Sequence, residues 1–84
     1  MVKLVYFAWI RERIGKSDEE IELPGDVETV ADLIGHLRSR GEEYALALQV
    51  PEVVHVAIDQ EHRQHGEPIG GAREIALFPP MTGG

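Results

Sequence analysis

The chain has 84 residues, no cysteine, and a net charge of −7 from 15 acidic and 8 basic side chains. The lack of cysteine excludes disulfides, thiolate metal sites, iron–sulfur ligation and cysteine nucleophiles. The negative charge disfavours nucleic acid and anionic membranes and favours a basic protein partner. No apolar run approaches the length of a membrane span, so we expect a soluble, cytoplasmic protein. A chain of this length forms one small domain with little room for an enclosed active site.

The N-terminal residues predict a central β-strand. Residues 2–10 are apolar at nearly every position, which is typical of a strand with neighbours on both sides. Residues 11–15 predict a helical turn closed by glycine, and residues 19–23 predict a half-buried outer strand. Alternation along the first strand divides its side chains between two faces, with Val2, Leu4 and Tyr6 on one and Lys3, Val5 and Phe7 on the other.

The middle of the chain predicts the main helix. Thr29, with Asp32 three residues later, resembles a capping box, and Gly41 stands where a C-terminal capping glycine belongs. Residues 42–48, rich in alanine and leucine and followed by proline, predict a second short helix. The apolar stripe of the main helix has the spacing i, i+3, i+4 and i+7 and consists of Val30, Leu33, Ile34 and Leu37.

The remaining residues predict three strands. Residues 54–59 alternate in hydrophobicity, residues 60–66 predict a turn with a short edge strand, and residues 68–73 predict a loop. Residues 74–78 predict the last strand. Its side chains alternate between the faces, with Ile75 and Leu77 on one and Ala76 and Phe78 on the other.

These elements predict an α+β fold. Placing the first and last strands side by side in parallel at the centre of a mixed sheet gives a β-grasp, or ubiquitin-like, architecture with one main crossing helix. The helix stripe would pack on Leu4, Tyr6, Ile75 and Leu77. The other face would carry an apolar patch that we interpret as a partner interface, formed by Val5, Phe7, Ala76 and Phe78. The alternative is that the two faces are reversed or that loops cover this patch.

The C-terminal residues form the candidate reactive segment. Phe78 precedes two prolines that cannot donate to a strand ladder, so the chain must leave the sheet there. Residues 79–84 then form a projecting tail that reaches about 19–20 Å when extended. Glycine at the tip neither blocks a narrow tunnel nor crowds attack on the carbonyl of Gly84. The alternative is a frayed end without function.

The histidines give no metal site in the sequence. Glu61, His62 and His65 would not place both imidazoles on one face of a strand or turn, so we predict no metal ligand and interpret them as solvated hairpin residues. His36 and His55 lack partners in the sequence and are interpreted as surface groups.

Several motifs resemble one known family along the whole chain. This family is the small subunit of molybdopterin synthase, the MoaD sulfur carriers, and the specific motif is the Phe-Pro-Pro-x-x-Gly-Gly ending. The chain departs from the family at Asp59, where asparagine is common, and at Met81-Thr82, where smaller residues are usual. The resemblance rests on Phe7-Ala8, Arg11-Glu12, Thr29-Val30 with Leu33, Ala45-Leu46-Ala47-Leu48, Ala57-Ile58-Asp59-Gln60 and Phe78-Pro79-Pro80-Met81-Thr82-Gly83-Gly84.

The resemblance implies a sulfur-carrier cycle. An E1-like adenylating enzyme would use ATP and Mg²⁺ to adenylate the Gly84 carboxylate, and sulfur would displace AMP to give a thiocarboxylate. The tail would insert into the large synthase subunit, which carries the catalytic residues, and sulfur would pass to cyclic pyranopterin monophosphate. The carrier itself would bind no cofactor and would join a heterotetramer with two large subunits. The inserted residues would be Pro79, Pro80, Met81, Thr82 and Gly83.

Two other classes of function stay open. One is a different carrier on the same fold, either a thiamine-type sulfur carrier or a ubiquitin-like modifier joined to lysines. The other is a binding module whose glycine end is incidental.

Overall fold

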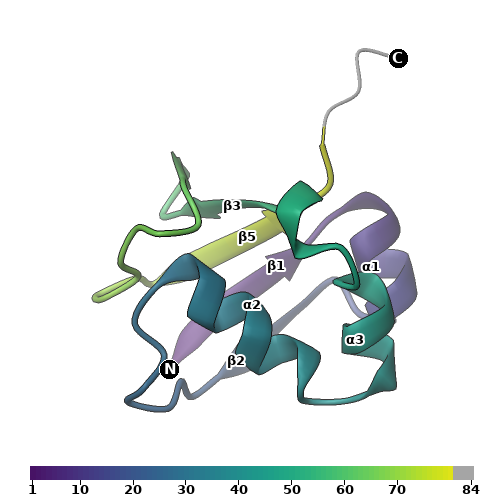
Figure 1. Ribbon diagram of the computed structural model, residues 1–84, viewed down its shortest axis with the longest axis horizontal. Helices are drawn as coiled ribbons and strands as arrows, with labels where there is room; N and C mark the ends of the chain where they lie inside the picture. The colour runs from purple at the N-terminus through teal and green to yellow at the C-terminus, as the bar shows by residue number, and fades with distance from the viewer. Residues whose placement is uncertain (81–84) are drawn as a thin grey trace.

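The computed structural model describes residues 1–80, which form a five-stranded sheet with helices (Figure 1). Among these residues, no helix has the length and apolar character needed to cross a membrane. In chain order the elements are β1 (Val2–Tyr6), α1 (Ala8–Ile14), β2 (Asp18–Ile21), α2 (Val30–Arg38), α3 (Glu42–Ala47), the 3-10 helix η1 (Pro51–Val53), β3 (His55–Ile58), β4 (Glu61–Arg63) and β5 (Glu74–Phe78).

The sheet has the strand order β2-β1-β5-β3-β4. Strands β1 and β5 pair in parallel at its centre, with Val5 opposite Ala76. The other three pairings are antiparallel. The predicted α+β architecture with the first and last strands side by side is therefore confirmed, and Figure 1 shows α2 crossing one face of this sheet.

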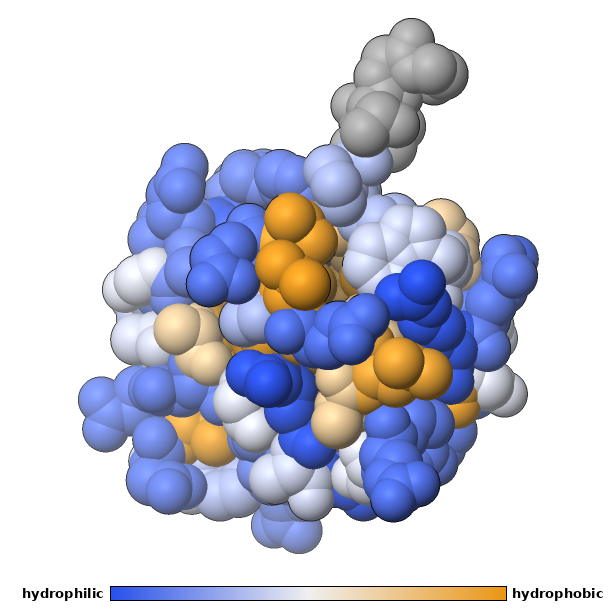
Figure 2. All heavy atoms as spheres, turned by 45° about the vertical axis from the view of Figure 1, so that its right-hand side comes forward, coloured by the Kyte–Doolittle hydropathy of each residue, from blue (hydrophilic) through white to orange (hydrophobic). Residues whose placement is uncertain are grey.

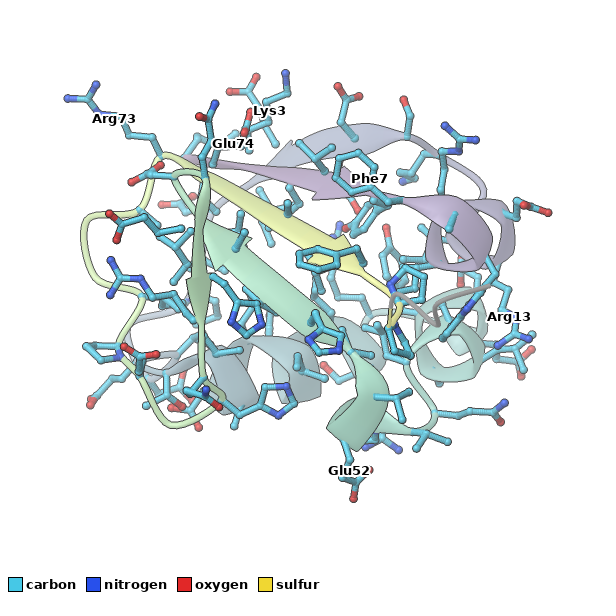
Figure 3. All side chains as sticks on the ribbon, turned by 90° about the horizontal axis from the view of Figure 1, so that it is seen from above. Lys3, Phe7, Arg13, Glu52, Arg73 and Glu74 are labelled. Carbon is cyan, nitrogen blue, oxygen red and sulfur yellow. The ribbon has the colours of Figure 1, made fainter. Side chains whose placement is uncertain are left out.

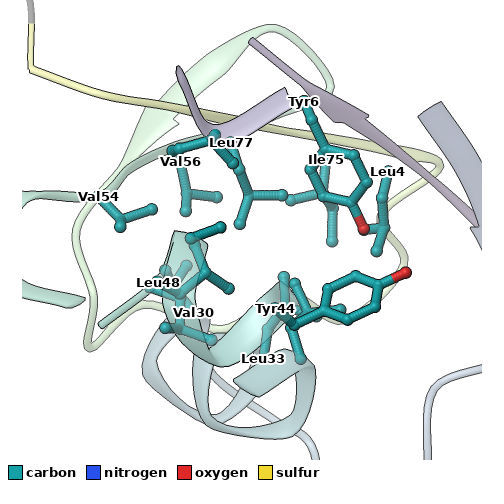
Figure 4. Close-up of a cluster of buried hydrophobic side chains, with 14 of the residues drawn as sticks. Leu4, Tyr6, Val30, Leu33, Tyr44, Leu48, Val54, Val56, Ile75 and Leu77 are labelled. Atoms are coloured by element: carbon teal, nitrogen blue, oxygen red, sulfur yellow. The ribbon is translucent and has the colours of Figure 1, made fainter. Parts of the chain in front are cut away.

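The core lies between α2 and the inner face of the sheet. The predicted helix stripe is buried, and the side chains predicted to face it are all at most 1% exposed. Figure 4 shows Val30 and Leu33 below the strand side chains of this core. Thr29 and Asp32 form the predicted capping box, in which the Asp32 N–H donates to Thr29 Oγ1 at 3.2 Å. The strand residues predicted to face the helix, all of them in this core, are Leu4, Tyr6, Ile75 and Leu77.

The prediction of one long N-terminal strand is wrong. Strand β1 ends at Tyr6, and the apolar run continues as helix α1, which ends at Ile14 and is capped by Gly15 in a left-handed conformation with φ 91°. Ile10 and Ile14 have the i, i+4 spacing of a helix face, and both are buried. Trp9 therefore lies on α1, where it packs partly against the core and Arg13 lies 4.6 Å from its ring centroid.

The prediction that Gly41 caps the main helix is also wrong. Helix α2 ends at Arg38 with Ser39 as its C-cap, and Gly41 is instead the N-cap of α3. The second short helix is confirmed as α3, and the short edge strand is confirmed as β4.

A carboxylate that the sequence analysis did not single out ties α3 to the sheet. Glu19 Oε2 accepts hydrogen bonds of 2.6 Å from the hydroxyls of both Tyr6 and Tyr44. Its other oxygen lies 3.2 Å from Arg40 and 3.5 Å from Lys16. Burial opposes ionisation of Glu19, but the two tyrosine hydrogen bonds and the two cations together lower its pKa below the usual value. The network holds β1, β2 and α3 together.

Candidate functional site

The four residues predicted as a partner interface lie together on the sheet face opposite α2. Val5 and Ala76 are register partners, Phe78 ends β5, and Phe7 directly follows β1. Phe7 is 45% exposed and the other three are half-buried. The predicted division of side chains between the two faces is therefore confirmed. Figure 3, which looks onto the sheet from above, shows Phe7 at one end and Lys3, Arg73 and Glu74 at the other.

The structure adds three residues to this surface. Ala57 pairs with Ala76 across β3 and β5, and with His62 across β3 and β4. His55, two residues before Ala57, shares its face and is the register partner of Phe78. We call the combined surface the outer patch; it consists of Val5, Phe7, His55, Ala57, His62, Ala76 and Phe78.

The aromatic rings of the outer patch contact one another. The His55 and Phe78 rings stack at 16° with centroids 5.6 Å apart, and the His62 ring lies 6.3 Å from Phe78. His55 Nδ1 and His62 Nε2 are 3.2 Å apart. His55 is a surface group, as predicted, but in the structure it has two partners that the sequence did not indicate, His62 and Phe78. The signal that could have found this pair is the β3–β4 hairpin, whose register places both residues on one face.

The outer patch adjoins the start of the predicted tail. Phe78 is followed by Pro79, which is buried, and Pro80, which is half-buried. The N–H of Phe7 donates to the carbonyl of Leu77 at 3.1 Å and so continues the pairing of β1 and β5 to this point. The predicted reactive residue Gly84 and the predicted insertion residues Met81, Thr82 and Gly83 lie outside the described residues.

The structure explains why aspartate can occupy position 59, where the resembled family commonly has asparagine. Asp59 and Gln60 adopt positive φ values of 50° and 74° in the turn between β3 and β4. Asp59 Oδ1 accepts hydrogen bonds from the backbone N–H groups of Arg73 at 3.1 Å and Glu74 at 3.0 Å. Asparagine also tolerates this conformation and offers the same oxygen. The departure therefore preserves the turn, which lies at the other end of β3 from His55.

The remaining histidine of the predicted hairpin, His65, contacts a backbone carbonyl group. His65 Nε2 lies 2.7 Å from the carbonyl oxygen of Val54. Across residues 1–80, no group of three or more histidine, cysteine, aspartate or glutamate side chains could hold a metal ion.

The helical side of the molecule presents a different surface. Leu46 and Val50 are 52% and 50% exposed there. Figure 2 shows that on this side polar side chains separate the apolar groups into small areas. The outer patch, in contrast, has aromatic rings in mutual contact next to Pro79, where the predicted tail begins. It is the better candidate for a protein interface.

The strand order and the crossing helix are those of a small β-grasp protein, and comparison with known proteins defines its family. Residues 4–84 match the ThiS family model. The chain belongs to this ThiS family, which includes the MoaD-type carriers.

Its relatives include two proteins named molybdopterin synthase sulfur carrier subunit. The protein from Escherichia coli K12 is 33% identical and that from Haemophilus influenzae is 37% identical, each over 84 residues and the whole of both chains.

Solved structures give the same fold. The chain assigned as molybdopterin converting factor subunit 1 of Pyrococcus furiosus superposes with a TM-score of 0.73 at 28% identity, covering 95% of this chain and 97% of the other. Small archaeal modifier protein 1 of Haloferax volcanii superposes with a TM-score of 0.71 at 25% identity, with the same two coverages.

Proposed function

We propose that the chain is the sulfur-carrier subunit of a molybdopterin synthase. The observation that carries this proposal is the full-length similarity to two proteins of that name. The Phe-Pro-Pro-x-x-Gly-Gly ending, which begins at the last residue of β5, also supports it. The outer patch beside that ending provides a surface on which a partner could hold the tail in place.

The chemistry is proposed to occur at the Gly84 carboxylate. A free carboxylate is a poor electrophile, so an E1-like enzyme with ATP and Mg²⁺ first adenylates it and releases pyrophosphate. A sulfur donor at the sulfide level then attacks the acyl carbon, and AMP leaves with its oxygen. The product is a thiocarboxylate whose sulfur is a strong nucleophile. This route needs no cysteine in the carrier, in agreement with a chain that has none.

The carrier is proposed to deliver this sulfur rather than to catalyse its transfer. The tail residues Pro79 to Gly83 enter the large synthase subunit, where catalytic residues and cyclic pyranopterin monophosphate meet the thiocarboxylate. The outer patch docks on the same subunit, with Phe7 and Phe78 as its aromatic contacts. Because β5 is paired on both sides, by β1 and β3, Phe78 is held in a fixed position at the base of the tail.

Reconstitution tests this proposal. The purified chain, charged with sulfur by its activating enzyme, is mixed with the large subunit and cyclic pyranopterin monophosphate, and molybdopterin is measured. We expect molybdopterin from the charged chain and none from the uncharged chain. Failure of the charged chain with a large subunit that works with another carrier would refute the proposal.

The second candidate function is protein modification. It is favoured by the structural similarity to small archaeal modifier protein 1 of Haloferax volcanii. In this case a lysine amine, rather than sulfur, would attack the activated Gly84 and form an isopeptide bond. Conjugates of higher mass in cells would support a modifier, and free carrier alone would support the synthase. A thiamine-type carrier would instead form the thiocarboxylate but fail to yield molybdopterin in the reconstitution.

A further inference from the structure

We propose that His55 and His62 form a two-imidazole binding site for a divalent transition-metal ion on the outer patch. His55 Nδ1 and His62 Nε2 lie at hydrogen-bond distance, 3.2 Å, and a metal ion would take the place of the hydrogen between them. Metal–nitrogen bonds to histidine are roughly 2.0–2.1 Å long, so two ligands of one ion lie about 3.4 Å apart in a tetrahedron and about 2.9 Å apart at a right angle. The observed spacing lies between these two values.

The backbone holds the two imidazoles in this arrangement. His62 lies opposite Ala57 in the antiparallel β3–β4 pair, and His55 lies two residues before Ala57 on the same face. Stacking on Phe78 fixes the orientation of the His55 ring. A metal ion would therefore bind to ligands that are already in position, and little conformational entropy would be lost on binding.

The two imidazoles are also accessible. His62 is exposed and His55 is half-buried, and both line a surface cavity that His65 also lines. His65 Nε2 already contacts the Val54 carbonyl, so we do not assign it as a third ligand. Residues 1–80 supply no set of three ligands, and water would complete the coordination of the ion. The site is therefore open.

The ligand type defines the class of ion. Neutral imidazole nitrogens suit copper, nickel and zinc, whereas magnesium and calcium require oxygen ligands. Along the divalent series a nitrogen site binds Cu²⁺ most strongly. The sequence-based expectation of no metal role considered only His62 with Glu61 and His65. It did not consider the contact between β3 and β4 that brings His55 to His62.

Metal titration of the untagged chain tests the site. Isothermal titration calorimetry with Cu²⁺, and separately with Zn²⁺, should give one ion per chain with tighter binding of Cu²⁺. His55→Gln and His62→Gln should each weaken Cu²⁺ binding by about tenfold or more. The matched controls His36→Gln and His65→Gln should bind as the unchanged chain does. Circular dichroism confirms that each variant is folded.

Two further measurements test whether both imidazoles bind the Cu²⁺ ion. The electron paramagnetic resonance spectrum of the Cu²⁺ complex should show coupling to two imidazole nitrogens, and Cu²⁺ should raise the thermal unfolding temperature of the unchanged chain but not of His62→Gln. Equal Cu²⁺ affinity in His55→Gln, His62→Gln and the unchanged chain would overturn the proposal. Loss of binding in His36→Gln would also overturn it, because the ion would then lie elsewhere.

Discussion

His55 stacks on Phe78, its register partner across β3 and β5, with the ring centroids 5.6 Å apart. Phe78 is the last residue of β5 and precedes the two prolines that begin the tail. The aromatic part of the outer patch is thus attached directly to Pro79, where the predicted tail begins. A partner that binds these rings would hold Pro79 and Pro80 in a defined position, as the proposed insertion of residues 79–84 requires.

A charge at Phe7 should weaken binding of the large synthase subunit. Burying a phenylalanine ring contributes about 1.5–3 kcal/mol, so Phe7→Glu should lower the affinity roughly ten- to hundredfold. Calorimetric titration of the large subunit measures this. The matched control is Leu46→Glu, because Leu46 on α3 is 52% exposed against 45% for Phe7. Normal binding by Phe7→Glu would show that the outer patch is not the interface.

Removal of one hydroxyl from the Glu19 network should destabilise the fold. Tyr44→Phe deletes a 2.6 Å hydrogen bond to a carboxylate, and hydrogen bonds to charged groups contribute about 1.5–3 kcal/mol. Because Tyr6 still donates to Glu19, we expect a loss near the lower end of this range. Urea denaturation measures the free energy of unfolding. An unchanged value in Tyr44→Phe would mean that the network does not stabilise α3.

The same network predicts a pH dependence. The folded state lowers the pKa of Glu19, so its contribution to stability is present above the pKa of the unfolded chain, about 4.3, and is lost as pH falls through the lower folded value. We expect the free energy of unfolding to decrease from about pH 5 to pH 3. Glu19→Gln should be less stable at neutral pH and should show a smaller decrease. Some decrease in the free energy of unfolding should remain in that variant, because the pKa of Asp32 is also lowered. The cause is the hydrogen bonds that Asp32 accepts from the backbone N–H groups of Glu28 and Thr29.

The turn at Asp59 predicts a contrast between two substitutions. Asp59→Ala removes the acceptor of two backbone hydrogen bonds and places alanine at a positive φ, so we expect a loss of about 1–3 kcal/mol. Asp59→Asn keeps the oxygen and the conformation and should change stability much less. Thermal unfolding of both variants measures the contrast. Equal losses would show that charge, rather than the hydrogen-bonding oxygen, stabilises the turn.

The sequence predicted elements whose signal is local. The stripe on α2 has a clear 3.6-residue period, and β5 alternates along its length, so both were predicted with their buried faces. The N-terminal run was misassigned because residues 2–10 are apolar almost throughout, and such a run does not distinguish a strand from a buried helix by periodicity. The chain changes conformation at Phe7 and Ala8, where no glycine or proline marks the change.

The contacts that escaped prediction depend on how separate elements meet in the fold. His55 meets His62 only through the register of β3 and β4, and Glu19 meets Tyr44 across 25 positions. The Glu19–Tyr44 contact has no signal in sequence spacing, and the His55–His62 contact follows from the β3–β4 hairpin only once its register is known. The four residues predicted as an interface, Val5, Phe7, Ala76 and Phe78, could be grouped in advance because strand alternation and one parallel pairing are sufficient to place them.

The mass of the intact chain before and after sulfur transfer tests the proposed function most directly. After incubation with the activating enzyme, ATP, Mg²⁺ and a sulfur donor, one oxygen at Gly84 should be exchanged for one sulfur. The original mass should return when the large subunit and cyclic pyranopterin monophosphate are added. A chain with alanine appended after Gly84 should show no exchange. No exchange in the unchanged chain, with an enzyme that charges another carrier, would contradict the account.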